Sequence, residues 1–327
     1  MSGSVLNKNW SLVDRENQAE RLARLLGWKG RGGNETEILE FLEDVPAFEI
    51  DTAAKSLLTE EEQHGYGLII PFGPVIEPYE TENCVVSKDP LEMAREAWTN
   101  EIDLIVTGAS FEGIFKAFYG EDKVVEFLAN PSYFAPLKEL NLTPEDPKAV
   151  EYGKKIKNLY YEDGQEPSLE NQKQYLKYVS DFFFWHGLYR TINSRLTHAT
   201  GKTYLMRFDI DGELNMFKKL VKKLEKYEGT SHADDLFYIF NTEFHEPPPP
   251  DSKEFATIKK IVGIFTSFAI TGDLNCEEVP NLLIEPITNP SKCINFTVDD
   301  VAIIELPEEK NLKVWDSIYN ELNVPLY

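Results

Sequence analysis

The chain has 327 residues, of which 42% are hydrophobic and 12% aromatic, enough apolar material to fill a large core. Its formal net charge of −23 argues against nucleic acid or an anionic membrane surface as a partner, because both would repel it. The charge is spread along the chain rather than gathered in a tail, so solubility accounts for it. No run of about 18 apolar residues occurs, and we therefore expect no membrane-spanning segment.

The cysteines Cys84, Cys276 and Cys293 are too few and too scattered for a disulfide framework or a zinc site. We therefore expect reduced thiols, no metal and no cofactor. No charged-then-apolar leader follows Met1, which favours a cytoplasmic over a secreted chain, and any signal peptide would lie upstream of that residue.

The first quarter of the chain predicts short helices and an irregular segment. Apolar residues at helical spacing predict a surface pair of helices over residues 18–28 and 35–45, separated by a turn. Pro and Gly interrupt the apolar stretch 67–75, which predicts a buried irregular strand or loop. A helix over residues 91–98, closed by Asn100, follows.

A predicted strand over residues 102–106 leads to the first candidate functional residue. This short apolar run contains β-branched residues and indicates a central strand. The chain then breaks into small residues and presents Glu112 just past the carboxyl end of the strand, where ligand and catalytic groups collect in open α/β sheets. The alternative is that Glu112 begins the next helix and faces water.

Helices and strands alternate over the rest of the chain. We expect helices over residues 147–161, 169–197 (long and aromatic), 215–227 (basic, with a solvated face), 255–270 (ended by Gly272) and 311–322, a strand over 202–210, and two short strands about a turn at 299–300 within 293–306. Because helices and strands interleave, the fold class is α/β. No repeat, linker or charge block divides the chain, so we expect one compact unit.

The segment 229–235 places a histidine directly after a turn of small residues. Ser231 lies three residues before Asp234, which is the spacing of a capping box and predicts the start of a helix. His232 would then lie in the first helical turn, where the positive end of the helix dipole disfavours imidazolium and leaves a neutral ring that accepts a proton. The plainer interpretation is that His232 is only a polar residue at a helix start.

Taken together, several stretches resemble the type-B carboxylesterase family, nearest its insect-type alpha-esterase branch: GASFEG around Glu112, YLMRFD around Arg207, GTSHADDL around His232 and VWDSIYNEL near the end. The resemblance covers residues 1–327, which would then be the carboxyl-terminal part of a single α/β-hydrolase domain. It implies a Ser…Glu…His triad in that chain order. On this resemblance Glu112 orients the imidazole, and His232 is the general base.

The chain departs from the family at the nucleophile. No Gly-x-Ser-x-Gly elbow and no glycine-rich oxyanion segment occurs in these residues. We therefore expect an incomplete α/β-hydrolase fold, the carboxyl-terminal half of the domain without its first strands. The chain as written should be inactive towards esters and, with an exposed sheet edge, should fold poorly.

The resemblance also implies an apolar substrate pocket formed by Trp10, Ile69, Phe115, Phe184 and Phe217, with core packing as the alternative for each. Such a pocket implies small to medium neutral carboxylic esters, including lipid or xenobiotic esters, as substrates. A homodimer is compatible with the resemblance. The alternative function is a non-catalytic α/β-hydrolase relative that acts in binding or adhesion, but the presence of both Glu112 and His232 favours the hydrolase.

Overall fold

The computed structural model of the chain describes residues 3–4, 6–7, 17–68, 70–77, 81–118, 121–220 and 224–327. Internal contacts divide the chain into two compact units, one of residues 1–7, 90–121 and 155–327 and one of residues 8–89 and 122–154. Trp10 and Ile69, which the sequence suggested as pocket residues, lie outside the described residues. In the described part of the chain, no helix is long and apolar enough to cross a membrane.

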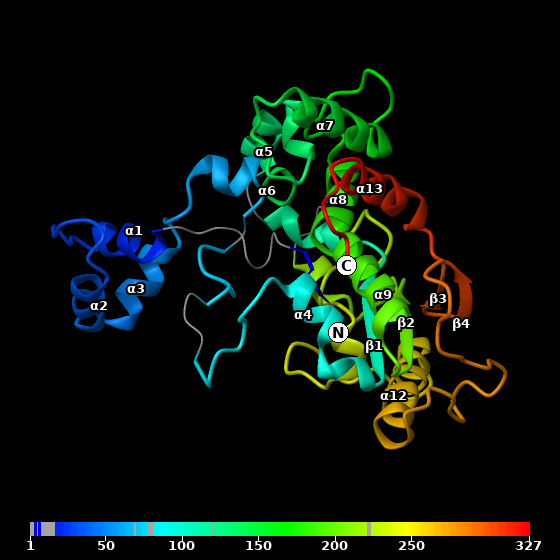
Figure 1. Cartoon of the computed structure of the whole chain (residues 1–327). Helices are drawn as coiled ribbons and strands as arrows, with labels where there is room; N and C mark the ends of the chain where they lie inside the picture. Colours follow the sequence, from blue (N-terminus) through cyan, green and yellow to red (C-terminus); the bar gives the residue numbers. More distant parts are fainter. Residues whose placement is uncertain are drawn as a thin grey trace. The chain divides into compact units, whose positions relative to one another are not determined.

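The smaller unit is helical. Its described elements are α1 (Gln18–Leu25), α2 (Glu35–Glu43), α3 (Ala47–Ala54), the π-helical turn η1 (Glu61–Gly65), α5 (Glu121–Leu128), the 3-10 turn η4 (Pro131–Phe134) and α6 (Leu137–Leu140), with α7 (Pro147–Tyr160) continuing into the larger unit (Figure 1). The helices α1 and α2 pack as the predicted pair, since Ala23, Trp28 and Ile38 form one apolar cluster.

The larger unit holds the sheet, in which the described strands follow the order β1-β2-β3-β4: β1 (Leu104–Ala109), β2 (Thr203–Phe208), β3 (Lys292–Phe296) and β4 (Val301–Glu305) (Figure 1). The pairs β1–β2 and β2–β3 are parallel, and β3–β4 is an antiparallel hairpin. Ala109 is in register with Phe208, so the carboxyl ends of β1 and β2 lie side by side.

The helical elements of the larger unit are α4 (Pro90–Glu96), η2 (Trp98–Glu101), η3 (Glu112–Phe118), α8 (Gln172–Ser180), the π-helical turn η5 (Asp181–Trp185), α9 (His186–His198), α10 (Met216–Lys219), α11 (Leu236–Ile239), α12 (Lys253–Thr271) and α13 (Glu309–Glu321). The long aromatic helix that the sequence predicted is present as α8, η5 and α9 in direct succession. As predicted, Gly272 ends α12, with φ of 73° in the left-handed region that glycine favours.

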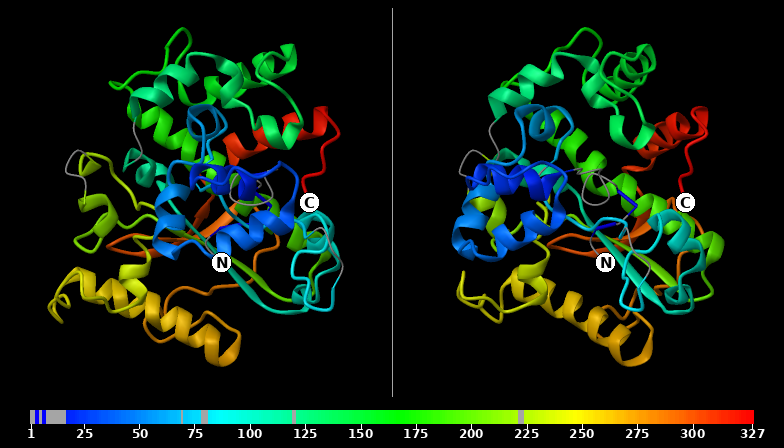
Figure 2. Two further views of the ribbon diagram at one scale, coloured as in Figure 1. Left: turned by 90° about the vertical axis from the view of Figure 1, so that its left-hand side faces the viewer. Right: turned by 60° about the vertical axis from the view of Figure 1, so that its left-hand side comes forward.

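Helices cover both faces of the sheet (Figure 2). On one face Met206 packs with Ile261 of α12, and on the other Leu205 packs with Leu188 of α9 and Leu312 of α13. Burial on both faces explains why β1 and β2 carry mostly apolar residues instead of a regular alternation with polar ones. The same burial misled the sequence prediction for β1, because among the described strands β1 pairs only with β2 and is not central. The strand also continues to Ala109 instead of ending at residue 106.

The basic amphipathic helix predicted over residues 215–227 is wrong. Among the described residues of this segment, only α10 is α-helical. The physical reason is that Lys218 does not face solvent. The residue is 4% exposed, and its ammonium group donates to the Asp211 carboxylate and lies 3.4 Å from the Gly229 carbonyl oxygen. Lys218 is therefore the buried residue of the short α10 and does not belong to a solvated basic face.

Candidate active site

Glu112 lies where the chain leaves the carboxyl end of β1. It begins η3 and is only 2% exposed, so the interpretation in which it faces water is wrong. Both carboxylate oxygens have partners: Oε1 accepts a hydrogen bond from the backbone N–H of Ala109 at 2.7 Å, and Oε2 lies 2.8 Å from Nδ1 of His232. A buried carboxylate held at both oxygens has one orientation, and that orientation is fixed towards the imidazole.

The glycines of the GASFEG stretch allow this segment to pack closely against α8, η5 and α9. A Cβ on Gly108 would lie 2.7 Å from Cζ2 of Trp185, and a Cβ on Gly113 would lie 2.0 Å from the Leu176 carbonyl oxygen. The backbone N–H of Gly113 also donates to Ser180 Oγ at 2.9 Å. Only glycine permits these approaches, so the spacing of the motif reflects helix packing on both sides of Glu112.

The histidine loop docks onto the Glu112 loop through backbone groups. The N–H of Thr230 donates to Ser110 Oγ at 3.0 Å, the N–H of Phe111 donates to the Thr230 carbonyl at 3.0 Å, and the N–H of His232 donates to the Glu112 carbonyl at 3.3 Å. These contacts resemble a short stretch of strand pairing between segments 120 residues apart in sequence. Together with the Ser110 hydroxyl, these backbone groups bring the segments that carry Glu112 and His232 next to each other.

The capping-box spacing predicted that His232 lies in the first turn of a helix, and this prediction is wrong. Residues 232–235 form turns, and α11 begins only at Leu236. Ala233 has φ of 67°, which is incompatible with a right-handed helix. Half of the predicted box is present, since the Asp234 carboxylate accepts from the Ser231 N–H at 3.3 Å, but Ser231 Oγ has no hydrogen-bond partner among the described residues.

The electrostatic expectation for His232 is also reversed. Burial disfavours imidazolium and by itself would lower the pKa, but the hydrogen bond and charge of Glu112 outweigh it, with smaller contributions from Asp235 and Asp234, so the pKa of His232 is raised. Burial raises the pKa of Asp235 to about 6, and the negative charge of Glu112 adds to that rise. The imidazole therefore has Glu112 as its hydrogen-bonded partner, and Asp235 and Asp234 are further acidic groups that favour its protonated form.

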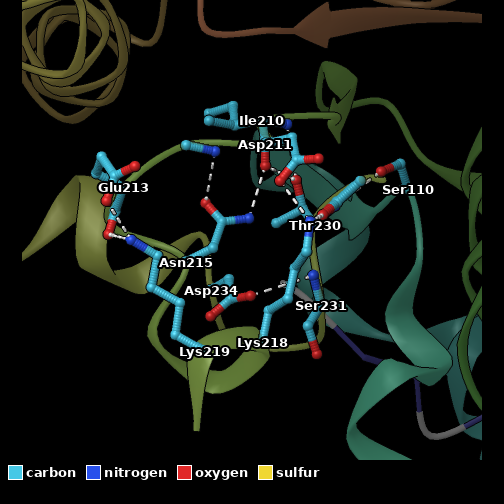
Figure 3. A network of polar contacts seen from close by, with 12 residues as sticks. Ser110, Ile210, Asp211, Glu213, Asn215, Lys218, Lys219, Thr230, Ser231 and Asp234 are labelled. Carbon is cyan, nitrogen blue, oxygen red and sulfur yellow. Dashed lines mark hydrogen bonds and ion pairs between the residues drawn. The ribbon is translucent and has the colours of Figure 1, made fainter. Parts of the chain in front are cut away.

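A polar network behind the histidine loop was missed by the sequence prediction (Figure 3). Thr230 Oγ1 accepts from the Ile210 N–H at 2.7 Å and donates to the Ile210 carbonyl at 2.9 Å. Asn215 Nδ2 donates to the same carbonyl at 2.7 Å, and Asp234 Oδ1 accepts from the Phe217 N–H at 2.7 Å. The network connects the loop after β2 to the loop that carries His232. No motif or residue spacing in the sequence predicts these contacts.

The aromatic residues suggested for a pocket separate into groups. The Phe184 and Phe115 rings lie 4.4 Å and 5.8 Å from the His232 ring, centroid to centroid. Phe217 instead lies 5.7 Å from Phe237, packed against the apolar cluster that contains α12. The first two are therefore neighbours of the acid–histidine pair, whereas the Phe217 ring packs against the core.

The sheet, its covering helices and the buried acid–histidine pair past the ends of β1 and β2 define an α/β-hydrolase fold. The structure is similar to juvenile hormone esterase from Manduca sexta, solved with OTFP covalently attached, with a TM-score of 0.77 over 96% of this chain and 58% of that chain. Sequence identity to that structure is 21%, so this likeness concerns the fold alone.

The chain belongs to the carboxylesterase family, whose profile matches residues 1–315. Esterase B1 of Culex pipiens is 36% identical over 327 residues, which cover 98% of this chain and 59% of that protein. Juvenile hormone esterase of Heliothis virescens is 26% identical over 269 residues, which cover 79% of this chain and 45% of that protein. The family and its insect members confirm the resemblance seen in the sequence, and the chain spans between 45% and 59% of the length of these relatives.

Proposed function

We propose that this chain carries the acid and the base of a serine-type carboxylic ester hydrolase. The observation that supports the proposal is the contact of 2.8 Å between His232 Nδ1 and the buried Glu112 carboxylate. Its chain order, acid before histidine, is the order of the family's triad. Relatives that are named esterases support the reaction class.

In this proposal each group has one task. Glu112 accepts a hydrogen bond from the Nδ1–H group, which leaves Nε2 of the neutral ring free to take a proton from a serine hydroxyl during attack on the ester carbonyl. The imidazolium that forms is stabilised by the carboxylate, and Nε2 then returns the proton to the leaving alkoxide. The raised pKa of His232, in which Glu112 overcomes the opposing effect of burial, suits a residue that must gain a proton during the reaction.

The serine in this proposal lies outside these 327 residues, because no Gly-x-Ser-x-Gly occurs within them. The oxyanion donors would come from the same additional segment. The chain by itself is then inactive towards esters, since the nucleophile and the stabilising donors both are required for turnover. In this proposal the chain supplies the acid and the base, and the additional segment supplies the serine and the oxyanion donors.

The substrates we propose are neutral carboxylic esters of small to medium size. Phe184 and Phe115 lie beside the His232 ring and give the reacting side of the pair an apolar surround. An apolar pocket with few polar anchors selects ligands by shape and hydrophobicity, and a net charge of −23 disfavours anionic substrates.

The test is to read the coding sequence upstream of Met1, express the longest reading frame and assay p-nitrophenyl butyrate. We expect an in-frame nucleophile elbow, and we expect Glu112→Gln and His232→Ala each to lower kcat by about 10⁴-fold. The exposed His198 at the end of α9 supplies the matched control, and His198→Ala should leave kcat unchanged.

Two results would contradict the proposal. An elbow that lacks serine would favour the binding or adhesion function instead. Hydrolysis by the 327-residue chain alone, abolished by His232→Ala, would show that the nucleophile lies within these residues after all.

A further inference from the structure

We propose that Trp185 is a positioning residue for the Glu112–His232 pair and acts by fixing the backbone at the end of β1. This inference rests on the proposed function, since it concerns the same pair. Trp185 is fully buried, and its indole Nε1 donates to the Ala109 carbonyl at 2.9 Å.

Ala109 is the point at which β1 meets the catalytic carboxylate. Its own N–H donates to Glu112 Oε1 at 2.7 Å, while its carbonyl accepts from Trp185. The next peptide N–H, that of Ser110, donates to the Phe208 carbonyl at 2.7 Å and so fixes the same peptide group from its other end. The backbone on both sides of the Ala109 Cα is thus held, and the N–H that orients Glu112 has one direction.

The π-helical turn brings Trp185 to this position. Within η5 the N–H of His186 donates to the Asp181 carbonyl, five residues earlier. In a regular α-helix, residues five positions apart point about 140° away from each other, but the wider turn returns them towards one face. Ser180 and Trp185, five positions apart, both contact the Glu112 segment, at Gly113 and at Ala109.

Phe184 extends the same surface to the histidine, because its ring lies 4.4 Å from the His232 ring. The turn therefore contacts the acid through Ala109 and the base through Phe184. Gly108 belongs to the arrangement as well, since a Cβ there would lie 2.7 Å from Trp185 Cζ2 and would push the indole away from Ala109. One short helical irregularity supports both members of the pair.

Loss of the indole N–H would leave the buried Ala109 carbonyl without this donor, so that only the Ser110 N–H would hold the peptide and the backbone at Ala109 could shift. Glu112 would then lose the alignment of Oε1 with the Ala109 N–H, and Oε2 would bind the imidazole less well. The expected effect is a roughly threefold decrease in the proton affinity of His232, which is the size of a partial loss of one hydrogen bond.

The experiment measures how the rate of His232 modification by diethylpyrocarbonate depends on pH. The 327-residue chain is used at low micromolar concentration, and the modified peptide is quantified by mass spectrometry. The His232 side chain is 34% exposed, so the reagent reaches it, and the neutral ring is the reactive form. Trp185→Phe removes the indole N–H. Trp315→Phe is the matched control, because Trp315 is 1% exposed and donates to Tyr160 Oη at 3.1 Å, away from Ala109.

We expect Trp185→Phe to move the His232 midpoint to lower pH by a threefold change in affinity, and Trp315→Phe to leave it unchanged. If Trp185→Phe does not fold, replacement of Trp185 by benzothienylalanine keeps the ring shape and removes only the N–H. Glu112→Gln separates the two proposals, because it must lower the proton affinity of His232 about tenfold if the acid–base pair exists.

A shift with Glu112→Gln but none with either Trp185 replacement would overturn the positioning role and leave the proposed function standing. Equal shifts with Trp185→Phe and Trp315→Phe would also overturn it, since any buried tryptophan would then have the same effect. No shift with Glu112→Gln would remove the pair itself, and with it both the proposed function and the role of Trp185.

Discussion

The close approach at Gly113 makes a sharp prediction about stability. A Cβ on this residue would lie 2.0 Å from the Leu176 carbonyl oxygen and 3.0 Å from the backbone N of Ser180. Both obstacles are backbone atoms of α8, so no side-chain rotation relieves the clash. Because real Cβ atoms are essentially never found within 3.0 Å of a neighbour, Gly113→Ala requires α8 and η3 to separate by roughly 1 Å.

We expect this separation to lower the free energy of unfolding by about 3 kcal/mol, at the upper end of the cost of overpacking. Part of the loss is the hydrogen bond of 2.9 Å from the Gly113 N–H to Ser180 Oγ, which the separation would stretch. Urea unfolding followed by tryptophan fluorescence measures the change, since Trp185 and Trp315 are buried in this unit.

Gly3→Ala is the matched control for Gly113→Ala, because a Cβ on Gly3 meets nothing within 4 Å in the part of the chain that the structure describes. The control should change the free energy of unfolding by no more than about 0.5 kcal/mol. A loss below about 1 kcal/mol for Gly113→Ala would refute the reasoning, since it would mean that α8 is not packed directly on the Glu112 segment.

Further substitutions test the surroundings of the site. Arg207→Met removes the buried guanidinium that binds the half-buried Glu308 at 2.9 Å and should lower the free energy of unfolding by about 3–5 kcal/mol in urea, whereas adding Glu308→Gln should restore part of it. Thr230→Val removes the hydroxyl that bonds both backbone groups of Ile210 and should cost about 1–3 kcal/mol in the same assay; an unchanged midpoint would contradict the network. The pKa of His232 is raised, against the effect of burial, by Glu112, so protonation stabilises the fold below the ordinary value of 6.5 and this contribution is lost as the pH rises through the raised pKa. The difference in urea midpoint between the wild type and His232→Gln should therefore shrink from pH 6 to pH 8.5.

The pattern of apolar residues predicted most elements of the larger unit correctly because burial and periodicity coincide there. The hairpin of β3 and β4, the helix α12 and the long aromatic helix all follow spacing rules that act within one element. The placement of β1 within the sheet does not follow from its own sequence. A strand covered by helices on both faces is apolar whether or not it has a neighbour on each side.

The sequence predicted which residues form the candidate site better than it predicted how they are arranged. Glu112 was expected just past the strand and is there, but its burial depends on α8 and η5, which are distant in sequence. His232 was expected in a helix because Ser231 and Asp234 have capping-box spacing, and the spacing did predict the Asp234 contact to the Ser231 N–H. The left-handed Ala233 then delays the helix to Leu236, and no local rule predicts such a residue at an alanine.

Core packing and pocket lining were alternatives for Phe184, but in the aromatic run 182–185 a residue packed in the core also contacts the candidate site. Phe184 is 2% exposed and Trp185 is fully buried, as core residues are, yet one contacts the His232 ring and the other holds the Ala109 carbonyl. A buried aromatic side chain fixes position because its neighbours leave it one place to occupy. Core packing therefore supplies the rigidity that the proposed general base needs. Substitutions inside the run should change the titration of His232 even where the substituted residue contacts no substrate.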